Sequence, residues 1–141
     1  MLLTVERVAL LRRVRLFAET PDRALAGLAQ VVTEVEFAAG ATVMREGAVE
    51  DWLYVVVDGE LEVLREDRRA IIGAGEVVGE LAVLDPMPRS ATVRALTDSL
   101  LFRLDKAAFD EAVDERPEIA RGIIRDLVRR LREPRAPSGT A

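Results

Sequence analysis

Short β-rich runs broken at regular intervals by glycine fill the middle of the chain, over residues 33–104. The runs occupy residues 33–37, 42–44, 52–57, 60–64, 70–72, 90–95 and 99–104. Short strands at such regular spacing are typical of an all-β roll or barrel. Asp58-Gly59, between the third and fourth runs, predicts a hairpin, because a type I′ turn needs positive φ at both central residues. The segment is therefore predicted to be the β-rich part of one domain.

Helical patterns precede this segment. Apolar side chains recur at helical spacing through residues 4–17, with arginines between them. Thr20-Pro21-Asp22 then offers an N-cap and a proline at the first helical position, which predicts a second helix ending near Val32. Residues 1–32 are therefore expected to form N-terminal helices.

Two further helices are predicted after the β-rich segment, over residues 105–133. Asp105 is placed to cap the first of them, and Glu115-Arg116-Pro117 separates it from the second. The second helix carries an apolar stripe that includes Leu127, and this stripe would either pack against the roll or form a dimer seam. The tail, residues 134–141, has nothing to bury and is predicted to be flexible.

Two missing residue types remove several kinds of chemistry. The chain has no cysteine and no histidine, which excludes disulfides, thiolate nucleophiles, imidazole catalysis and metal sites built from these residues. An enzyme would have to work with carboxylates, serine, Tyr54, Lys106 and arginines. A net charge of −5 does not favour a nucleic-acid partner. No membrane span or secretory signal is recognisable in the sequence, so a cytoplasmic location is expected.

Residues 75–93 contain the groups best placed to bind a ligand. Gly79 opens a short helical turn, since glycine adopts backbone angles that are closed to other residues. The backbone N–H groups of Leu81 and Ala82, at the start of that turn, would be free to bind an anion. A proline-rich turn then brings Arg89 back toward the same N–H groups.

A carboxylate and a guanidinium suit the two ends of a sugar phosphate. Glu80 only accepts hydrogen bonds and so fits a ribose hydroxyl; Arg89 donates in a fork that fits a phosphate, and Ser90 adds a hydroxyl beside it. Each group alone has a plainer interpretation: Glu80 as a carboxylate favoured at a helix start, Arg89 as a surface charge paired with Asp85, and Gly79 as a turn. Their joint spacing favours a binding site.

The spacing resembles the phosphate-binding cassette of cyclic nucleotide-binding domains: Gly79-Glu80-Leu81-Ala82, six intervening residues, then Arg89-Ser90-Ala91-Thr92-Val93. That family includes the catabolite activator protein, the regulatory subunits of cyclic AMP-dependent protein kinase, and nucleotide-gated channels. The resemblance covers roughly residues 15–132. It implies one domain over residues 1–133: a double-stranded β-helix, or jelly-roll-like β-roll, with the cassette at 79–93, N-terminal helices and two C-terminal helices.

The resemblance also implies a role for each cassette residue. Glu80 would bind the ribose 2′-hydroxyl and Arg89 the exocyclic phosphate oxygens, while the N–H groups of Leu81 and Ala82 complete the phosphate cradle. The other implied contacts are Gly79, Ser90 and Ala91 on the phosphate wall, Val63 and Val78 beside the sugar and base, and Leu127 as a lid over the base. Val78 stands where many members carry a larger aromatic residue, and members with an aliphatic residue there exist.

The function implied is that of a non-catalytic sensor. It would bind cyclic AMP in preference to cyclic GMP, without a metal ion, and relay binding through its C-terminal helices to an effector domain or partner protein outside this chain. A hydroxyl after the arginine also suits cyclic GMP through the guanine amino group, so the base stays open at this point. A homodimer is compatible with the apolar stripe of the last helix. The alternative is a nucleotide-free structural or protein-interaction module of the same fold.

Overall fold

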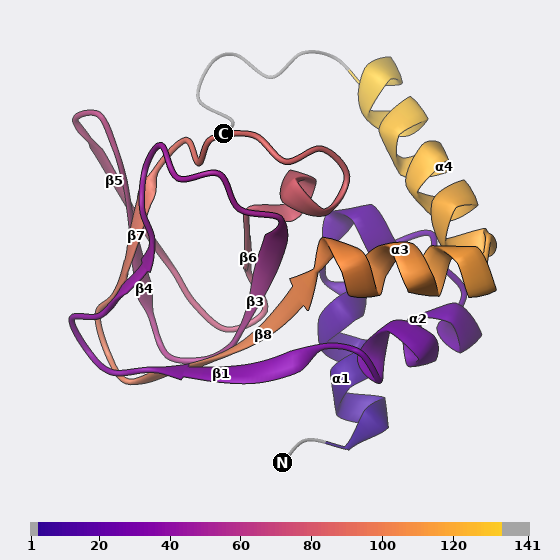
Figure 1. The fold of residues 1–141 in the computed structure, drawn as a ribbon, viewed down its shortest axis with the longest axis horizontal. Coiled ribbons are helices and arrows are strands. Elements are labelled where there is room, and N and C mark those ends of the chain that lie inside the picture. The colour runs from indigo at the N-terminus through magenta and orange to yellow at the C-terminus, as the bar shows by residue number, and fades with distance from the viewer. Residues whose placement is uncertain (1–2, 134–141) are drawn as a thin grey trace.

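The computed structural model describes residues 3–133, in which eight strands form two antiparallel four-stranded sheets (Figure 1). One sheet has the order β1-β8-β3-β6 and the other the order β2-β7-β4-β5. The strands are β1 (Thr33–Phe37), β2 (Thr42–Met44), β3 (Trp52–Asp58), β4 (Leu61–Arg65), β5 (Arg68–Ile72), β6 (Val77–Val78), β7 (Thr92–Ala95) and β8 (Ser99–Asp105). Inward-facing side chains of both sheets, such as Val56, Leu61 and Leu101, pack in a single cluster. The predicted β-roll is confirmed.

Asp58-Gly59 does not close a hairpin, so that prediction is wrong. β3 pairs with β8 and β6 in one sheet, whereas β4 pairs with β5 and β7 in the other. The dipeptide therefore carries the chain between sheets, and of its two residues only Gly59 has a positive φ, 105°. A Cβ atom on Gly59 would lie 2.8 Å from the Cα atom of Ser99, so the crossing requires glycine. The two-residue hairpin turn lies instead at Glu66-Asp67, between β4 and β5.

The helices gather at one end of the roll (Figure 1). They are α1 (Thr4–Arg12), the 3₁₀ helix η1 (Arg15–Phe17), α2 (Asp22–Ala29), the 3₁₀ helix η2 (Glu80–Val83), α3 (Lys106–Glu115) and α4 (Glu118–Arg132). The single helix predicted over residues 4–17 is wrong in its second half, because α1 ends at Arg12 and a separate turn follows. The second helix is shorter than predicted: its N-cap position is Pro21 rather than Thr20. Both C-terminal helices are present, although Asp105 makes no side-chain capping bond to α3.

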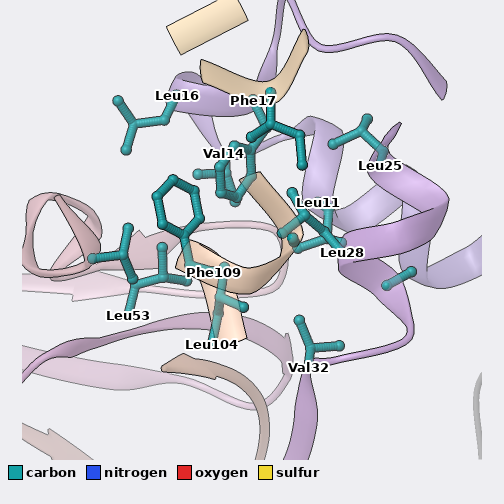
Figure 2. Close-up of a cluster of buried hydrophobic side chains, with 14 of the residues drawn as sticks. Leu11, Val14, Leu16, Phe17, Leu25, Leu28, Val32, Leu53, Leu104 and Phe109 are labelled. Atoms are coloured by element: carbon teal, nitrogen blue, oxygen red, sulfur yellow. The ribbon is translucent and has the colours of Figure 1, made fainter. Parts of the chain in front are cut away.

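A second apolar core joins these helices to the sheet that contains β3 and β8 (Figure 2). Leu11, Phe17 and Leu28 from the N-terminal helices are fully buried there. The rings of Phe17 and Phe109 stack with their centroids 6.2 Å apart, which ties α3 to η1. The helical end is thus packed against the roll through aromatic and leucine side chains.

The stripe of α4 divides into a buried and an exposed part. Ile119 and Ile123 are buried in the helical core, whereas Ile124 and Leu131 are 59% and 85% exposed. The stripe therefore does pack against the domain, but only over its first half. Over residues 3–133, no helix combines the length and apolar character needed to cross a bilayer.

Candidate functional site

Gly79 and Arg89 lie in direct contact, although nine residues separate them in the chain. Gly79 has the left-handed angles φ 71° and ψ 31° at the position that opens η2. A Cβ atom built on Gly79 would overlap Nη1 of Arg89. Glycine is thus required twice at this position, by the backbone angle and by the guanidinium that covers it.

The two backbone N–H groups of the predicted cradle differ in their hydrogen bonding. The N–H of Ala82 donates to the carbonyl oxygen of Gly79 at 3.1 Å, within the 3₁₀ turn. The N–H of Leu81 donates to no protein acceptor within residues 3–133. In this conformation Leu81 therefore offers an open donor beside Gly79 and Arg89, and Ala82 does not.

Arg89 is buried and held from two sides. Its side chain is 3% exposed, its Nε donates to Glu50 Oε1 at 3.0 Å, and its Nη2 donates to the carbonyl oxygen of Trp52 at 2.6 Å. Nη1, the nitrogen beside Gly79, donates to no acceptor among the described residues. The plainer interpretation of Arg89 as a surface charge paired with Asp85 is wrong. The guanidinium is fixed with one face of its fork directed at the start of η2.

The loop before β3 sets this position. The N–H of Arg89 donates to the carbonyl oxygen of Ala48 and the N–H of Gly47 to that of Arg89, both at 2.8 Å. The backbone is thereby pinned next to Glu50 and Trp52, and β7 begins only at Thr92, two residues later than predicted. Nothing in the sequence marks Glu50 or Trp52 as site residues, since they precede Arg89 by 39 and 37 residues, in a charged loop and at the start of β3.

Glu80 faces the last helix. Its Oε1 lies 3.5 Å from Nη2 of Arg130, and the same Nη2 lies 2.9 Å from Oδ2 of Asp126, whose side chain is almost completely buried. Oδ1 of Asp126 in turn lies 3.7 Å from Nε of Arg15. Arg15 also donates to Glu133 at 2.9 Å, and this hydrogen bond raises the pKa of Arg15. A row of alternating charges thus connects the cassette with α4 and η1.

Ser90 and Ala91 continue from Arg89 along the wall of the roll. Oγ of Ser90 accepts a hydrogen bond from Nη2 of Arg65 at 2.7 Å. Nε of Arg65 is buried and has no partner among the described residues. Arg65 therefore adds a second guanidinium near the cassette, which the sequence does not reveal because Arg65 precedes Ser90 by 25 residues.

Val63 and Val78 lie where the prediction needs them, in the interior of the roll. Val78 pairs with Tyr54, Val63 pairs with Val93, and both valines pack with the cluster that joins the two sheets. Leu127 lies elsewhere: with Leu84 it lines an open apolar groove of about 530 Å³ between α3 and α4. Figure 1 shows α4 beside α3, at the helical end of the molecule. Of the nine predicted contact residues, seven lie in the cassette, Val78 lies in β6 directly before it, and Val63 lies in β4. Leu127, the predicted lid, lies on the helical side.

This arrangement could bind a small anion that also carries hydroxyl groups. Arg89 Nη1 and the Leu81 N–H supply donors, and Glu80 supplies an acceptor whose present partner is an exchangeable arginine. Within residues 3–133, no three acidic side chains gather closely enough to hold a metal ion.

Comparisons with known proteins find similar domains in several of them. The family described as "Cyclic nucleotide-binding domain" matches residues 34–116. The CRP-like cAMP-activated global transcriptional regulator of Mycobacterium tuberculosis is 32% identical over 129 residues, covering 87% of this chain and 58% of its own length. The cGMP-dependent protein kinase egl-4 of Caenorhabditis elegans is 45% identical over 85 residues, 58% of this chain and 11% of its own length. The chain thus spans little more than half of the first relative and a small part of the second.

Among solved structures, the N-terminal domain of a transcriptional regulator from Streptomyces coelicolor A3(2) superposes with a TM-score of 0.81. It is 39% identical in sequence, and the match covers 87% of this chain and 92% of that one. The roll, the flanking helices and their order along the chain are therefore shared with a solved domain.

Proposed function

This chain belongs to the cyclic nucleotide-binding domain family, and from that premise we propose that it is a non-catalytic sensor that binds cyclic AMP in preference to cyclic GMP. The observation that carries the proposal is the guanidinium of Arg89, buried and fixed with Nη1 beside Gly79. Nε and Nη2 of this guanidinium are already bound by Glu50 and the Trp52 carbonyl, which leaves Nη1 as the donor for a ligand oxygen. A cyclic phosphate oxygen is the acceptor that we propose.

The ligand contacts follow from the positions described above. Arg89 Nη1 and the N–H of Leu81 bind the exocyclic phosphate oxygens, and Ala82 joins them when the turn at Gly79 opens. Glu80 accepts a hydrogen bond from the ribose 2′-hydroxyl. The remaining wall of the pocket is formed by Ser90, Ala91, Val63 and Val78.

The preference for adenine is supported by the surroundings of Ser90. A guanine amino group would need Ser90 Oγ as an acceptor, and one of the two lone pairs of that oxygen already accepts a hydrogen bond from Arg65 at 2.7 Å. The positive charge of Arg65 makes a further N–H donor at the same oxygen less favourable. A relative named as cAMP-activated, which matches 87% of the chain, supports the same choice.

The signal leaves the site through Glu80. Because Arg130 of α4 lies 3.5 Å from the carboxylate that the ribose needs, ligand binding and the position of α4 are coupled through one side chain. α4 would then pass the change to an effector domain or partner protein outside this chain, or to a second copy of the domain along its exposed stripe. Leu127 would reach the base only if α4 moved toward the roll. The cytoplasm, where cyclic nucleotides are made, is the proposed location.

Isothermal titration calorimetry with cyclic AMP and cyclic GMP tests the proposal. We expect saturable binding of both nucleotides, tighter for cyclic AMP, and no consumption of either on prolonged incubation. Absence of binding to either nucleotide would leave the nucleotide-free interaction module as the function. Turnover of the ligand would instead identify an enzyme.

A further inference from the structure

Glu50 is the one carboxylate in direct contact with the phosphate-binding arginine among the described residues. Its Oε1 accepts from Arg89 Nε at 3.0 Å, and its side chain is 22% exposed, so solvent screens the pair only in part. The two groups form a neutral unit before any ligand arrives. Arg103, stacked 3.7 Å from the Trp52 ring on which Arg89 also rests, is itself paired with Asp105.

The contact with Glu50 limits how much negative charge the site accepts. A ligand phosphate on Nη1 would lie on the same guanidinium as Glu50, a few ångströms from its carboxylate. A cyclic phosphodiester carries one negative charge, whereas a phosphate monoester carries close to two at neutral pH, because its second pKa is about 6. Each additional ligand charge is repelled by Glu50, and the repulsion between charges so close is large where water is partly excluded.

We propose that Glu50 is a specificity-determining residue that makes this site select the singly charged cyclic phosphodiester over doubly charged 5′-phosphate monoesters. The inference rests on the proposed function and goes beyond it. Glu50 also positions Arg89, through the hydrogen bond to Nε, and this second role does not depend on its charge. The two roles separate in Glu50→Gln, since the amide oxygen still accepts from Nε while the negative charge is gone.

Three adenosine ligands distinguish charge from ring shape. They are cyclic AMP, 5′-AMP, and the methyl ester of 5′-AMP, which is open like 5′-AMP but singly charged like cyclic AMP. Affinities are measured by calorimetry at about pH 7.5 for the wild type, Glu50→Gln and Glu46→Gln. Glu46 lies exposed in the same loop and forms no ion pair in the described residues, so its variant is the matched control.

In Glu50→Gln, we expect the ratio of the Kd of 5′-AMP to the Kd of its methyl ester to fall by roughly tenfold or more. The ratio of the Kd of the methyl ester to the Kd of cyclic AMP, the affinity gap that reports ring shape, should stay as in the wild type. Glu46→Gln should leave both gaps unchanged. An unchanged 5′-AMP gap in a folded Glu50→Gln protein that still binds cyclic AMP overturns the role of Glu50 and leaves the proposed function standing. A wild type that binds none of the three ligands overturns both.

The wild type alone provides a second test that needs no variant. Lowering the pH from about 7.5 to about 6 protonates much of the 5′-AMP but not its methyl ester. The affinity ratio of 5′-AMP to the ester should rise. Glu80 and Arg65, other charged groups near the cassette, also act on the second phosphate charge. The pH test therefore reports the charge selectivity of the whole site, and the Glu50→Gln comparison assigns it to Glu50. A ratio that is independent of pH overturns the proposal.

Discussion

Oε1 of Glu80 and Nη2 of Arg130 lie 3.5 Å apart, which places the carboxylate that we propose binds a ribose hydroxyl against a cation of the last helix. The same arginine neutralises Asp126, a carboxylate that is almost fully buried. Arg130 therefore serves two carboxylates, and a ligand that engages Glu80 leaves it with one. The equilibrium between these two arrangements is the physical form that the proposed relay takes.

Replacing Arg130 with glutamine should tighten the binding of cyclic AMP, because the competitor of the ribose hydroxyl is removed. Both partners are about a quarter exposed, and such a pair is worth about 1 kcal/mol or less. The expected gain is therefore about twofold to fivefold in Kd, measured by calorimetry. Arg132→Gln, an exposed change on the same helix, should have no effect. Weaker binding in Arg130→Gln would mean that Arg130 supports Glu80 rather than competing for it.

Arg89→Ala should weaken cyclic AMP binding by roughly 100-fold or more, since a buried, charge-assisted contact to the phosphate is lost. Arg68→Ala, on the exposed strand β5, should bind as the wild type does. Thermal unfolding should accompany the titrations, because Glu50 loses its only partner in the described residues when Arg89 is truncated. Retention of wild-type affinity by a folded Arg89→Ala protein would remove the basis of the proposed site.

Gly79→Ala should abolish most of the binding, and Gly40→Ala provides its control. Both glycines have left-handed φ angles, 71° and 88°, so each alanine strains the backbone by about 1–2 kcal/mol. A Cβ atom on Gly40 meets nothing within 4 Å, whereas one on Gly79 overlaps Arg89 Nη1. Gly79→Ala should lose more stability in chemical denaturation than Gly40→Ala, because the overlap with Arg89 adds to the backbone strain, and only Gly79→Ala should lose affinity. Equal affinities would show that the guanidinium tolerates displacement.

Trp52, the single tryptophan of the chain, should report on ligand binding. Its carbonyl oxygen accepts from Arg89, and its ring centroid lies 5.9 Å from that guanidinium. A phosphate bound to Arg89 would change the electric field at the indole ring. Cyclic AMP should therefore cause a saturable change in Trp52 fluorescence, and the Kd from this change should equal the calorimetric Kd. The Arg89→Ala variant should show no such change. Free tryptophan amide titrated in parallel corrects for absorption by adenine.

The acid stability of the roll should depend on Glu62. A hydrogen bond from Arg69, aided by the charge of Arg94, lowers the pKa of Glu62 below its ordinary value of 4.5. Because the folded-state pKa is the lower one, the ion pair stabilises the fold above pH 4.5 and this contribution is lost as the pH falls through the folded-state value. Wild type should therefore exceed Glu62→Gln in denaturant stability near neutral pH, and the difference should shrink below pH 4.5. A stability difference between the two proteins that does not change with pH would contradict the lowered pKa of Glu62.

The sequence predicts the parts of this molecule that depend on neighbouring residues. The cassette is such a part: Gly79, the turn after it and the return at Arg89 lie within eleven residues, so spacing and glycine chemistry suffice. The last helix is another, since its apolar period is regular and its break at Pro117 is local. Local structure of this kind can be predicted without knowing which distant residues it contacts in the fold.

What the sequence leaves undetermined is pairing at a distance. Asp58-Gly59 has the composition of a hairpin turn, yet β3 and β4 take partners in different sheets, and strand partners are chosen by the whole roll. Asp85 is the nearer candidate partner of Arg89, but the fold supplies Glu50 from 39 residues away. Arg130 reaches Glu80 across 50 residues, for the same reason.

The anchoring of Arg89 by Glu50 and Trp52 has a thermodynamic consequence. A free arginine side chain carries about 2 kcal/mol of rotamer entropy, and here that freedom is lost when the chain folds rather than when a ligand arrives. Under the proposed function, recognition begins from a preorganised receptor, and the phosphate would meet a guanidinium that needs desolvation but almost no ordering. Selectivity among anions can in that case be set by charge and shape, because the guanidinium is in place before the ligand binds.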